Sequence, residues 1–500
     1  MLAQESEDRR TCTHVAECTS DVAAERRPSS RNPEQDLFQL SSEVHAARVV
    51  PRRIRVPSAS IPLSRDRAFR AAVSSLLLRG GWILTQNAKR EVLRGDVLVE
   101  DGTIAAVGTV RGGADREIDC IGCAVIPGLI NTHGHVANTL LRGRADDMPL
   151  EKMLEVAFAA DAKLTRRDVQ VGALLGCLEM LKSGTTSFVD LFYWEDEVAR
   201  AVRESGIRGF LAWTVLDPDK TTQRGTPVKN AEQFVKKQKE HRLITPMVGL
   251  QGVYACSEET YLAAKDVAER EEVNLHTHLS ETRVEVYEHE KRTGMRPVEW
   301  LDKIGFLSPR VSAAHCVWVT INEVRALARR GVAVAHCPVS NMKLASGGVA
   351  PVPEMRAEGV TVALGTDSAI SNNALDLFAD MKVCALLHKA TRWDASVMPA
   401  QTVLDLATID AANALGRGRE LGSVEVGKRA DLAVVDLRTP HATPFYPDHL
   451  CSQLVYSCRG ADVRATIVDG VMRVGDGRVI GVDEAEVLGR AQEIAVELFG

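Results

Sequence analysis

Apolar and polar positions change their period repeatedly along the middle of the chain. Amphipathic stretches with helical spacing alternate there with short apolar runs of the strand type. Strands that alternate with helices indicate parallel βα units, and eight units predict an α/β fold with a closed, TIM-like (β/α)8 barrel. The helical stretches are 171–184, 196–206, 231–241, 259–272, 321–331 and 352–359. The eight apolar runs are 129–135, 185–192, 208–216, 246–254, 273–281, 310–318, 331–339 and 360–368.

A doubly wound open sheet is the alternative arrangement of alternating strands and helices. Such a sheet usually carries a glycine-rich phosphate-binding turn after its first strand. The first apolar run of this chain ends instead in Thr-His-Gly-His at 132–135. The closed barrel is therefore the preferred prediction.

Segments of β type and of similar style lie on both sides of the barrel region. They fall within 73–126 and 421–485 and carry Asp-Gly turn signals. Because distant segments of matching style are expected to pair, they predict a small β-sandwich domain built from both flanks. The barrel then occupies 127–420 as an insertion, and a C-terminal helix is expected over 486–500.

Composition bears mainly on the N-terminal segment and on the classes of protein that can be excluded. The first 70 residues are polar and rich in arginine, so they bury too little apolar surface to fold, and a disordered extension is expected. The 500 residues are 45% apolar and 26% charged, with a net charge of -6. This balance predicts a soluble protein without a nucleic-acid or membrane surface. Eleven scattered cysteines favour reduced thiols and a cytoplasmic enzyme.

Histidines and an aspartate gather at the predicted carboxyl ends of the barrel strands, the edge where active sites of such barrels lie. His133 and His135 end the first run and share a face, because side chains two residues apart on a strand point the same way. Isolated interior histidines are often ordinary core residues, which is the expectation for two of the set, the fifth-strand His276 and the seventh-strand His336. The remaining strand-end residues are His278 and Glu281 on the fifth run, His315 on the sixth and Asp367 on the eighth.

Such a set of imidazoles and carboxylates suits one metal ion. These ligands favour zinc or another borderline divalent ion, with iron as the alternative. Three histidines and one aspartate leave a position for water, whose pKa the ion lowers from about 15.7 toward 7. A two-metal site would need a bridging ligand such as a modified lysine on the fourth strand, and 246–254 contains no lysine. We therefore expect one divalent metal.

The chain resembles the amidohydrolase superfamily, in the branch of metal-dependent deaminases and chlorohydrolases that act on guanine, cytosine, S-adenosylhomocysteine, methylthioadenosine and s-triazines. The resemblance spans about residues 73–485. It implies that His133, His135, His278 and Asp367 bind one metal. The motifs that carry it are PGLINTHGH, SGTTSFVD, HTHLSE, AAHC, HCPVSNMKLASG, LGTDS and GKRADLAVVD.

The resemblance also implies a mechanism and catalytic roles. Hydroxide that the metal generates from water attacks a carbon bonded to nitrogen, and Asp367 accepts the proton of the water. Glu281 delivers a proton to a ring or amidine nitrogen, and His315 stabilises the charge on the attacking oxygen. The expected activity is hydrolysis of a non-peptide C–N bond, as deamination of a purine, pyrimidine, pterin or triazine, nucleosides included. Family members often form dimers or larger assemblies, so a homo-oligomer is expected.

Three positions that would contact the substrate depart from the pattern of the branch. Gln251 stands where a substrate-contacting histidine is expected, and Trp213 stands where nucleoside deaminases carry an arginine. Asp161 corresponds to a glutamate that binds ribose. Exchanging arginine for tryptophan removes an ion-pairing fork and adds a stacking surface. These changes favour C–N hydrolysis more strongly than they favour specificity for an adenosine-like substrate.

Other functions remain open for the same set of residues. The metal site could hydrolyse a cyclic amide or amidine, or remove chloride from a triazine. An inactive barrel that serves as a binding protein is the alternative from another class. Release of ammonia separates deamination from the first two, and metal uptake separates an enzyme from the third.

Overall fold

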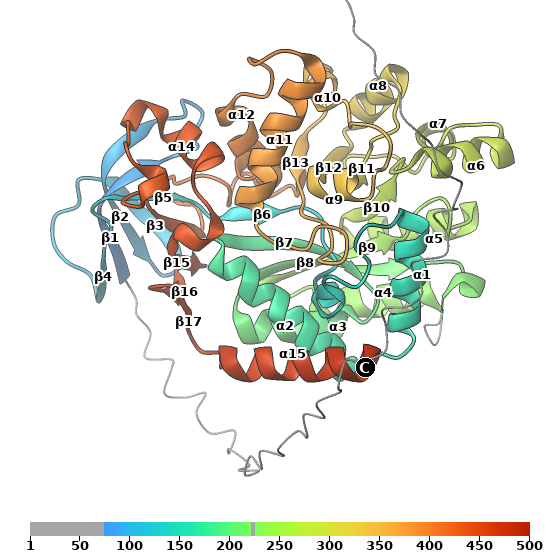
Figure 1. Ribbon diagram of the computed structural model, residues 1–500, viewed down its shortest axis with the longest axis horizontal. Coiled ribbons are helices and arrows are strands. Elements are labelled where there is room, and N and C mark those ends of the chain that lie inside the picture. The colour runs from blue at the N-terminus through green and yellow to red at the C-terminus, as the bar shows by residue number, and fades with distance from the viewer. Residues whose placement is uncertain (1–74, 222–225) are drawn as a thin grey trace, which may run out of the picture. The chain divides into compact units, whose positions relative to one another are not determined.

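The computed structural model describes residues 75–221 and 226–500. The extension expected over 1–70 lies outside the described residues. Two sheets organise the described chain: a parallel barrel of eight strands and a mixed sheet of nine (Figure 1). The predicted α/β fold, with a TIM-like barrel and a small β domain, is confirmed.

The barrel strands follow one another around the ring in chain order. The ring closes between its first and eighth strands, where Thr132 N donates to Leu364 O at 2.9 Å and Asp367 N donates to His133 O at 3.0 Å. Every predicted apolar run overlaps one strand. The strands are β6 (Leu129–Asn131), β7 (Thr185–Phe192), β8 (Arg208–Val215), β9 (Ile244–Leu250), β10 (Leu275–Leu279), β11 (Val311–His315), β12 (Ala333–His336) and β13 (Val362–Leu364).

Burial on both faces explains why these strands are apolar without alternation. Strands of a parallel barrel are covered by side chains inside and by helices outside. Accordingly, β7 and β8 are buried at every position. The helices that connect successive strands are α2 (Arg166–Lys182), α3 (Glu195–Ser205), α4 (Pro227–Gln238), α5 (Glu258–Glu271), α6 (Arg283–Thr293), α7 (Pro297–Lys303), α8 (Ile321–Arg330), α9 (Pro338–Lys343) and α10 (Val352–Ala357).

Glycines end two of these helices directly before a barrel strand. Gly206 after α3 and Gly331 after α8 have φ angles of 72° and 69°, in the left-handed region that glycine adopts without strain. The next strand can therefore begin after only two intervening residues. The connection from β6 to β7 also contains the 3₁₀ helix η2 (Val136–Leu141) and α1 (Leu150–Asp161). The helices after the last barrel strand include α11 (Leu377–Arg392), α12 (Ala400–Leu406), α13 (Ile409–Ala414) and α14 (Leu450–Tyr456).

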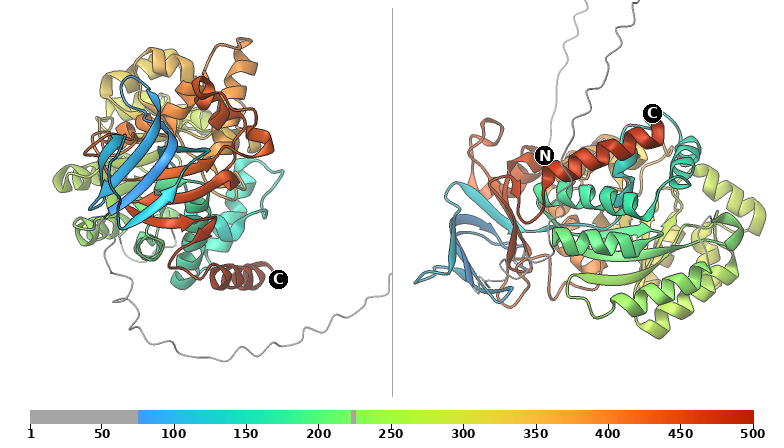
Figure 2. Two further views of the ribbon diagram at one scale, coloured as in Figure 1. Left: turned by 90° about the vertical axis from the view of Figure 1, so that its left-hand side faces the viewer. Right: turned by 90° about the horizontal axis from the view of Figure 1, so that it is seen from below.

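The second sheet joins strands from both flanks of the barrel. The flanks meet where β14 pairs antiparallel with β5, and β4 pairs with β1 at the side of the sheet. The C-terminal helix α15 (Glu484–Phe499) packs against α2 (Figure 2). The strands, in their spatial order, are β17 (Arg478–Val479), β16 (Val471–Gly475), β15 (Val463–Val468), β14 (Leu432–Asp436), β5 (Cys123–Pro127), β1 (Ser75–Leu84), β2 (Val92–Glu100) and β3 (Thr103–Gly108), with β4 (Arg116–Asp119) beside β1.

A buried ion pair fastens this sheet to the barrel. Arg208 begins β8, and its Nε and Nη2 donate to the two carboxylate oxygens of Asp431 at 2.9 and 3.0 Å. Both side chains are buried, and Asp431 directly precedes β14.

None of the described helices is both long enough and apolar enough to cross a lipid bilayer.

Candidate metal centre

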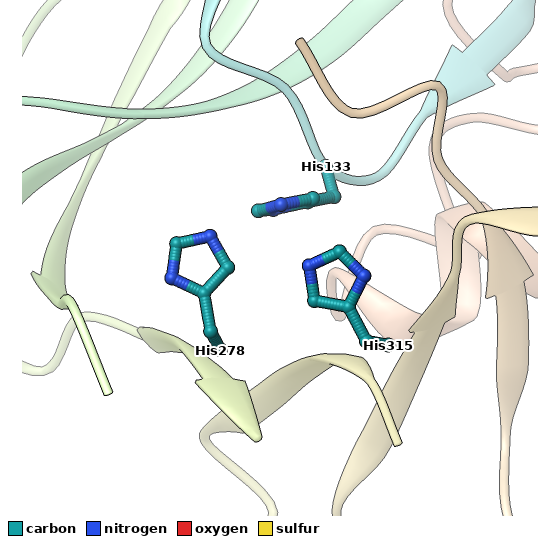
Figure 3. A group of neighbouring side chains, drawn as sticks. All are labelled: His133, His278 and His315. Carbon is teal, nitrogen blue, oxygen red and sulfur yellow. The ribbon is translucent and has the colours of Figure 1, made fainter. Parts of the chain in front are cut away.

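The predicted strand-end residues lie together at the carboxyl edge of the barrel. His133 and His135 follow β6, His278 lies in β10, His315 ends β11 and Asp367 follows β13. Figure 3 shows three of the imidazoles, His133, His278 and His315, facing one another. One ligand atom from each of these three lies within 4.8 Å of the others, and the same holds for His133, His135 and Asp367.

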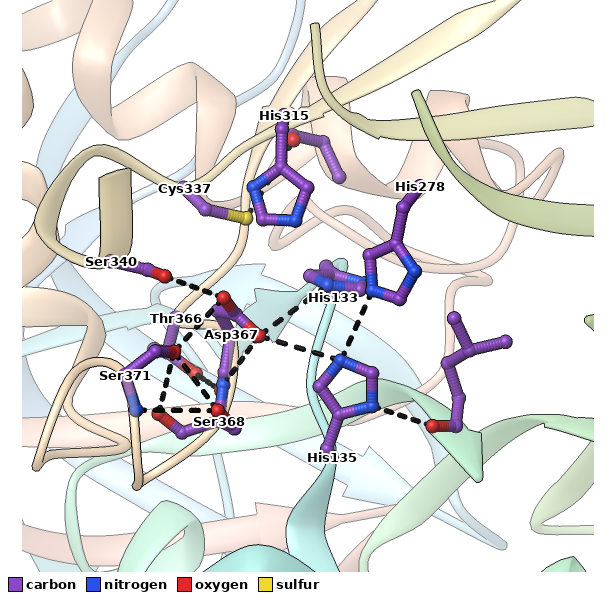
Figure 4. A network of polar contacts seen from close by, with 12 residues as sticks. His133, His135, His278, His315, Cys337, Ser340, Thr366, Asp367, Ser368 and Ser371 are labelled. Carbon is purple, nitrogen blue, oxygen red and sulfur yellow. Dashed lines mark hydrogen bonds and ion pairs between the residues drawn. The ribbon is translucent and has the colours of Figure 1, made fainter. Parts of the chain in front are cut away.

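The four expected metal ligands approach one another through defined atoms. Nε2 of His135 and Nε2 of His278 are 3.2 Å apart. Oδ1 of Asp367 lies 3.6 Å from Nε2 of His133 and 3.5 Å from Nε2 of His135 (Figure 4). Residues from three separate strands thus present nitrogen and oxygen atoms to one small volume.

The backbone is strained where two of these side chains leave it. His315 and Asp367 have φ angles of 73° and 62°, in the left-handed region that residues other than glycine rarely adopt. Strain of this kind is concentrated at functional sites because it aims particular side chains. Asp367 is then fixed by donors: Ser368 N at 2.7 Å to Oδ1, and Ser340 Oγ at 2.5 Å and Ser371 Oγ at 3.0 Å to Oδ2.

Hydrogen bonds on the far side of each ring set its orientation. Nδ1 of His135 donates to the Leu191 carbonyl at 2.6 Å, and Nδ1 of His278 donates to the Gln251 carbonyl at 2.7 Å. With the proton on Nδ1, each Nε2 keeps its lone pair and faces the centre of the cluster. This arrangement is typical of histidines that bind metals.

The third ring is oriented by a chain of two side chains. Nδ1 of His133 lies 2.8 Å from Nε2 of His276, and Nδ1 of His276 lies 2.6 Å from Oγ of Ser312. If each imidazole donates outward, Nε2 of His133 is left as an acceptor. That atom is buried and has no hydrogen-bond partner among the described residues. His276 is a buried residue, as expected, and in addition it holds His133.

The donor set fits a borderline divalent cation. Burial first, and then the neighbouring imidazoles, lower the pKa of His133 and of His278 well below the usual range, so both rings are neutral ligands. The 3.2 Å between Nε2 of His135 and Nε2 of His278 also matches the spacing of two ligands that share an ion. Ligand nitrogens ~2.0–2.1 Å from zinc in a tetrahedral site lie about 3.3 Å apart.

Glu281 and His315 stand beside this cluster. Oε2 of Glu281 lies 3.7 Å from Nε2 of His315, and both side chains are buried. Burial, followed by the nearby charges of Asp367 and Glu285, raises the pKa of the Glu281 carboxyl well above its usual range. A carboxyl in this environment can carry a proton to a bound molecule. On the other side of His315, Nδ1 lies 3.1 Å from Nδ2 of Asn341.

Two of the three candidate substrate contacts line the pocket above the cluster. This pocket has a volume of about 80 Å³ and is lined by Gln251 and Asp161 together with His135, His278 and Glu281, among others. Nε2 of Gln251 donates to the Tyr254 hydroxyl at 3.0 Å. Burial raises the pKa of Asp161 to about 6, against the opposing effect of a hydrogen bond from Tyr193.

Trp213 does not line this pocket. Its neighbour Thr214 does, and because side chains alternate along a strand, Trp213 points to the other face of β8. There its ring lies 5.6 Å from that of Phe234 on α4. Trp213 lines a larger hollow of about 640 Å³, which shares Asp161 and Tyr193 with the pocket.

Several residues of the site were not expected from the sequence. His276 had a signal, since it lies two residues before His278 and therefore on the same face of β10. Ser312, Asn341 and Ser340 had none, because their hydrogen bonds to the site depend on contacts between distant elements.

Comparison with other proteins identifies a family whose sequence pattern this chain matches. The chain matches the Amidohydrolase family over residues 124–473. It is 42% identical over 431 residues to a 5′-deoxyadenosine deaminase of Methanosarcina mazei, covering 85% of this chain and 99% of that protein. It is 43% identical over 433 residues to a 5-methylthioadenosine/S-adenosylhomocysteine deaminase of Syntrophobacter fumaroxidans, covering 84% and 98%.

Solved structures share the architecture. An adenosine deaminase from Xanthomonas campestris with bound zinc aligns with a TM-score of 0.82 at 31% identity, covering 85% of this chain and 98% of that one. An atrazine chlorohydrolase from Arthrobacter aurescens, complexed with zinc, aligns with a TM-score of 0.78 at 25% identity, covering 84% and 100%.

Proposed function

The chain belongs to the amidohydrolase family, and on that premise we propose that it deaminates a purine nucleoside of the 5′-deoxyadenosine type, with zinc as its metal. At the coarser level it is a metal-dependent hydrolase of C–N bonds other than peptide bonds, and it deaminates an aromatic nitrogen heterocycle. The observation that carries the proposal is the convergence of three histidines and Asp367 beside Glu281 at the base of one pocket.

Each side chain of the cluster has a role in this reaction. His133, His135, His278 and Asp367 would hold the ion, which in such sites supplies hydroxide from water at neutral pH. Asp367 accepts the proton that the water loses. Glu281 delivers a proton to the ring nitrogen next to the carbon that carries the amino group. Asp367 then passes its proton to the amino group, the C–N bond breaks and ammonia leaves, while Glu281 recovers a proton from the new hydroxyl as the carbonyl forms.

His315 completes the catalytic set. Its Nε2 lies 3.7 Å from the Glu281 carboxyl, so a substrate atom beside Glu281 also lies near this imidazole. A donor in that position stabilises negative charge on the attacking oxygen as the new C–O bond forms. The hydrogen-bond contact with Asn341 keeps the ring in place.

A small pocket and an adjoining larger hollow near these side chains favour a substrate with a base at one end and a further group at the other. The pocket of about 80 Å³ is far smaller than the ~300–1,000 Å³ of typical ligand sites, whereas the adjoining hollow measures about 640 Å³. In our proposal the purine base lies in the pocket against Gln251. The ribose hydroxyls donate to Asp161, which borders both spaces, and the 5′ end enters the hollow.

The lining of the hollow favours a neutral 5′ group. Trp213, Phe234 and Leu164 offer apolar and aromatic surface, and Arg166 is already paired with Asp196 and Glu197. Lys237 also lines the hollow, so S-adenosylhomocysteine, whose 5′ chain ends in a charged amino acid, is the most informative competitor.

Ammonia release from zinc-loaded protein tests the proposal. The substrates compared are 5′-deoxyadenosine, methylthioadenosine, S-adenosylhomocysteine, adenine and a chlorotriazine, with Glu281→Gln as the inactive control. We expect ammonia in proportion to the nucleoside consumed. For the neutral 5′ groups, kcat/KM should exceed that for S-adenosylhomocysteine roughly tenfold or more.

The other outcomes separate the remaining functions. Faster turnover of S-adenosylhomocysteine would overturn the preference for a neutral 5′ group and leave the deamination intact. Chloride release without ammonia, or turnover of free adenine alone, would contradict nucleoside deamination.

We also propose that the enzyme acts in the cytoplasm as a homo-oligomer. The nine cysteines in the described part of the chain are all free thiols, which suits a reducing compartment. Cell fractionation with an antibody to the chain tests the compartment, and light scattering tests the assembly. Recovery in a secreted fraction, or a monomer at all concentrations, would contradict the respective claim.

A further inference from the structure

Three side chains outside the pocket form a second cluster of metal-binding type. His336 ends β12, and Cys384 and His388 lie one turn apart on α11 (Figure 1). One ligand atom from each lies within 4.8 Å of the other two, and all three residues are buried. None of them lines the pocket above the candidate metal centre. The cluster is therefore separate from the proposed catalytic site.

Hydrogen bonding leaves this cluster incomplete. Nε2 of His336 and Nε2 of His388 are 3.3 Å apart, so at most one ring donates to the other. Nδ1 of each ring is buried and has no hydrogen-bond partner in the described chain. Buried imidazoles that lack partners destabilise a fold unless another interaction compensates for them. A cation bound to both Nε2 atoms would supply one to each ring, in place of the single proton that these two atoms can share.

The geometry and chemistry suit an ion of the zinc type. Imidazole nitrogens ~2.0–2.1 Å from a tetrahedral zinc ion lie about 3.3–3.4 Å apart, and Nε2 of His336 and Nε2 of His388 are 3.3 Å apart. A thiolate with two imidazoles selects borderline and soft ions over magnesium or calcium. The buried Asp380 lies one turn before Cys384 on the same face of α11, and burial raises the pKa of its carboxyl well above the usual range.

We propose that His336, Cys384 and His388 bind a second, structural cation, either zinc(II) or copper(I). On binding, a metal–sulfur bond replaces the S–H bond of Cys384, and the proton leaves to solvent. The ion would tie β12 to α11, the helix that follows the loop bearing Asp367. Because the cluster is buried, the ion is taken up while the chain folds.

Metal content and cobalt spectroscopy test the site without relying on catalysis. Protein is produced in media supplemented with zinc, copper or cobalt, and the bound metals are measured by elemental analysis. The proposed catalytic ligands are nitrogen and oxygen atoms only, so a thiolate-to-cobalt charge-transfer band reports the second site. We expect two metals per chain and this band in the wild type. Cys384→Ala should lose one metal and the band, whereas Cys177→Ala, another buried cysteine on a helix, should keep both.

The results distinguish this site from the proposed function. One metal per chain that is lost in Asp367→Asn and retained in Cys384→Ala, with no thiolate band in the wild type, would overturn the second site and leave the catalytic one. One metal that is lost only in Cys384→Ala would support the second site and count against the catalytic one. Elemental analysis of the protein from zinc and copper media identifies which ion the site prefers.

Discussion

Each imidazole at the candidate metal centre is held through the nitrogen that faces away from it. Backbone carbonyls of Leu191 and Gln251 hold His135 and His278. A backbone carbonyl is present whichever side chain the residue carries, so substitution does not remove these two acceptors. His133 depends instead on the side chain of His276, which makes His276 the residue through which substitution can most directly loosen the site.

His276→Leu should therefore weaken zinc binding by roughly 10–100-fold, the usual effect of losing a partner behind a metal ligand. His276→Gln should restore much of the affinity, because its amide oxygen can accept from Nδ1 of His133. Competition with a chromogenic chelator measures both values. His289→Leu, which removes another buried imidazole, is the control for general loss of packing. Equal zinc affinity in His276→Leu and the wild type would refute this positioning role.

Glu281→Gln should lower kcat by roughly 10²–10⁴-fold, the typical contribution of a general acid. Glutamine keeps the size of the side chain but has no acidic proton to deliver. Zinc content should stay unchanged, since Glu281 is not among the four proposed ligands. Glu290→Gln on the exposed face of α6 is the matched control. Retention of wild-type kcat in Glu281→Gln would remove the assigned role.

The carboxyl group of Asp161 destabilises the fold when it is ionised, and it is also the proposed acceptor for the ribose hydroxyls. Its pKa is raised from 3.8 to about 6 by burial, so the folded state resists ionisation. The unfolded state loses its proton near pH 4, and the folded state loses it only near pH 6. The destabilisation therefore begins as pH rises above about 4 and is complete above about 6, where it amounts to up to about 3 kcal/mol.

Asp161→Asn should consequently raise the free energy of unfolding at pH 7.5, with the gain shrinking toward zero near pH 4. The same variant should raise KM for the nucleoside while kcat changes little, because a neutral amide is a weaker acceptor for ribose hydroxyls than a carboxylate. Thermal unfolding across this pH range and steady-state kinetics check the two halves. A variant that is destabilised at pH 7.5 and unchanged in KM would contradict the account of Asp161.

Single residues show where inference from the sequence stops. The chemical types and strand-end positions of His133, His135, His278 and Asp367 are visible in the sequence, because the period of a strand fixes which neighbours share a face. The direction of Trp213 is not, because it depends on which residue of β8 faces the barrel interior. Thr214 faces the pocket, so Trp213 faces α4.

At the scale of elements, the barrel strands were predictable and one important helix was not. Continuous apolar runs identify strands that are covered on both faces. The buried stripe of α11 instead contains Asp380, Cys384 and His388, so polar residues interrupt its apolar pattern. The polar residues that form the second cluster therefore also obscured the helical pattern of α11 in the sequence.

The attachment of β8 to the second sheet gives a prediction at this scale. Arg208→Met should lower the free energy of unfolding by about 3–5 kcal/mol, because it leaves the buried carboxylate of Asp431 without its partner. Arg200→Met on α3 removes an exposed arginine paired with Glu197 and should cost about 1 kcal/mol or less. Chemical denaturation measures both. Equal stability of the two variants would show that the buried pair does not fasten the sheet.

At the scale of the whole molecule, the two flanks of the barrel form one sheet through the pairing of β14 with β5. The sequence predicts that such flanks associate, but the register follows from packing between residues about 300 positions apart and is not legible in either segment alone. The same limit applies to the metal centre, whose ligands come from three distant strands. Their convergence could be predicted only because a barrel brings all its strand ends to one edge.

That convergence is the central claim, and anomalous diffraction at the zinc absorption edge tests it most directly. Crystals of zinc-loaded protein should show an anomalous peak within bonding distance of Nε2 of His133, His135 and His278 and of a carboxylate oxygen of Asp367. Zinc bound elsewhere in the crystal with no peak among these four side chains would contradict the account.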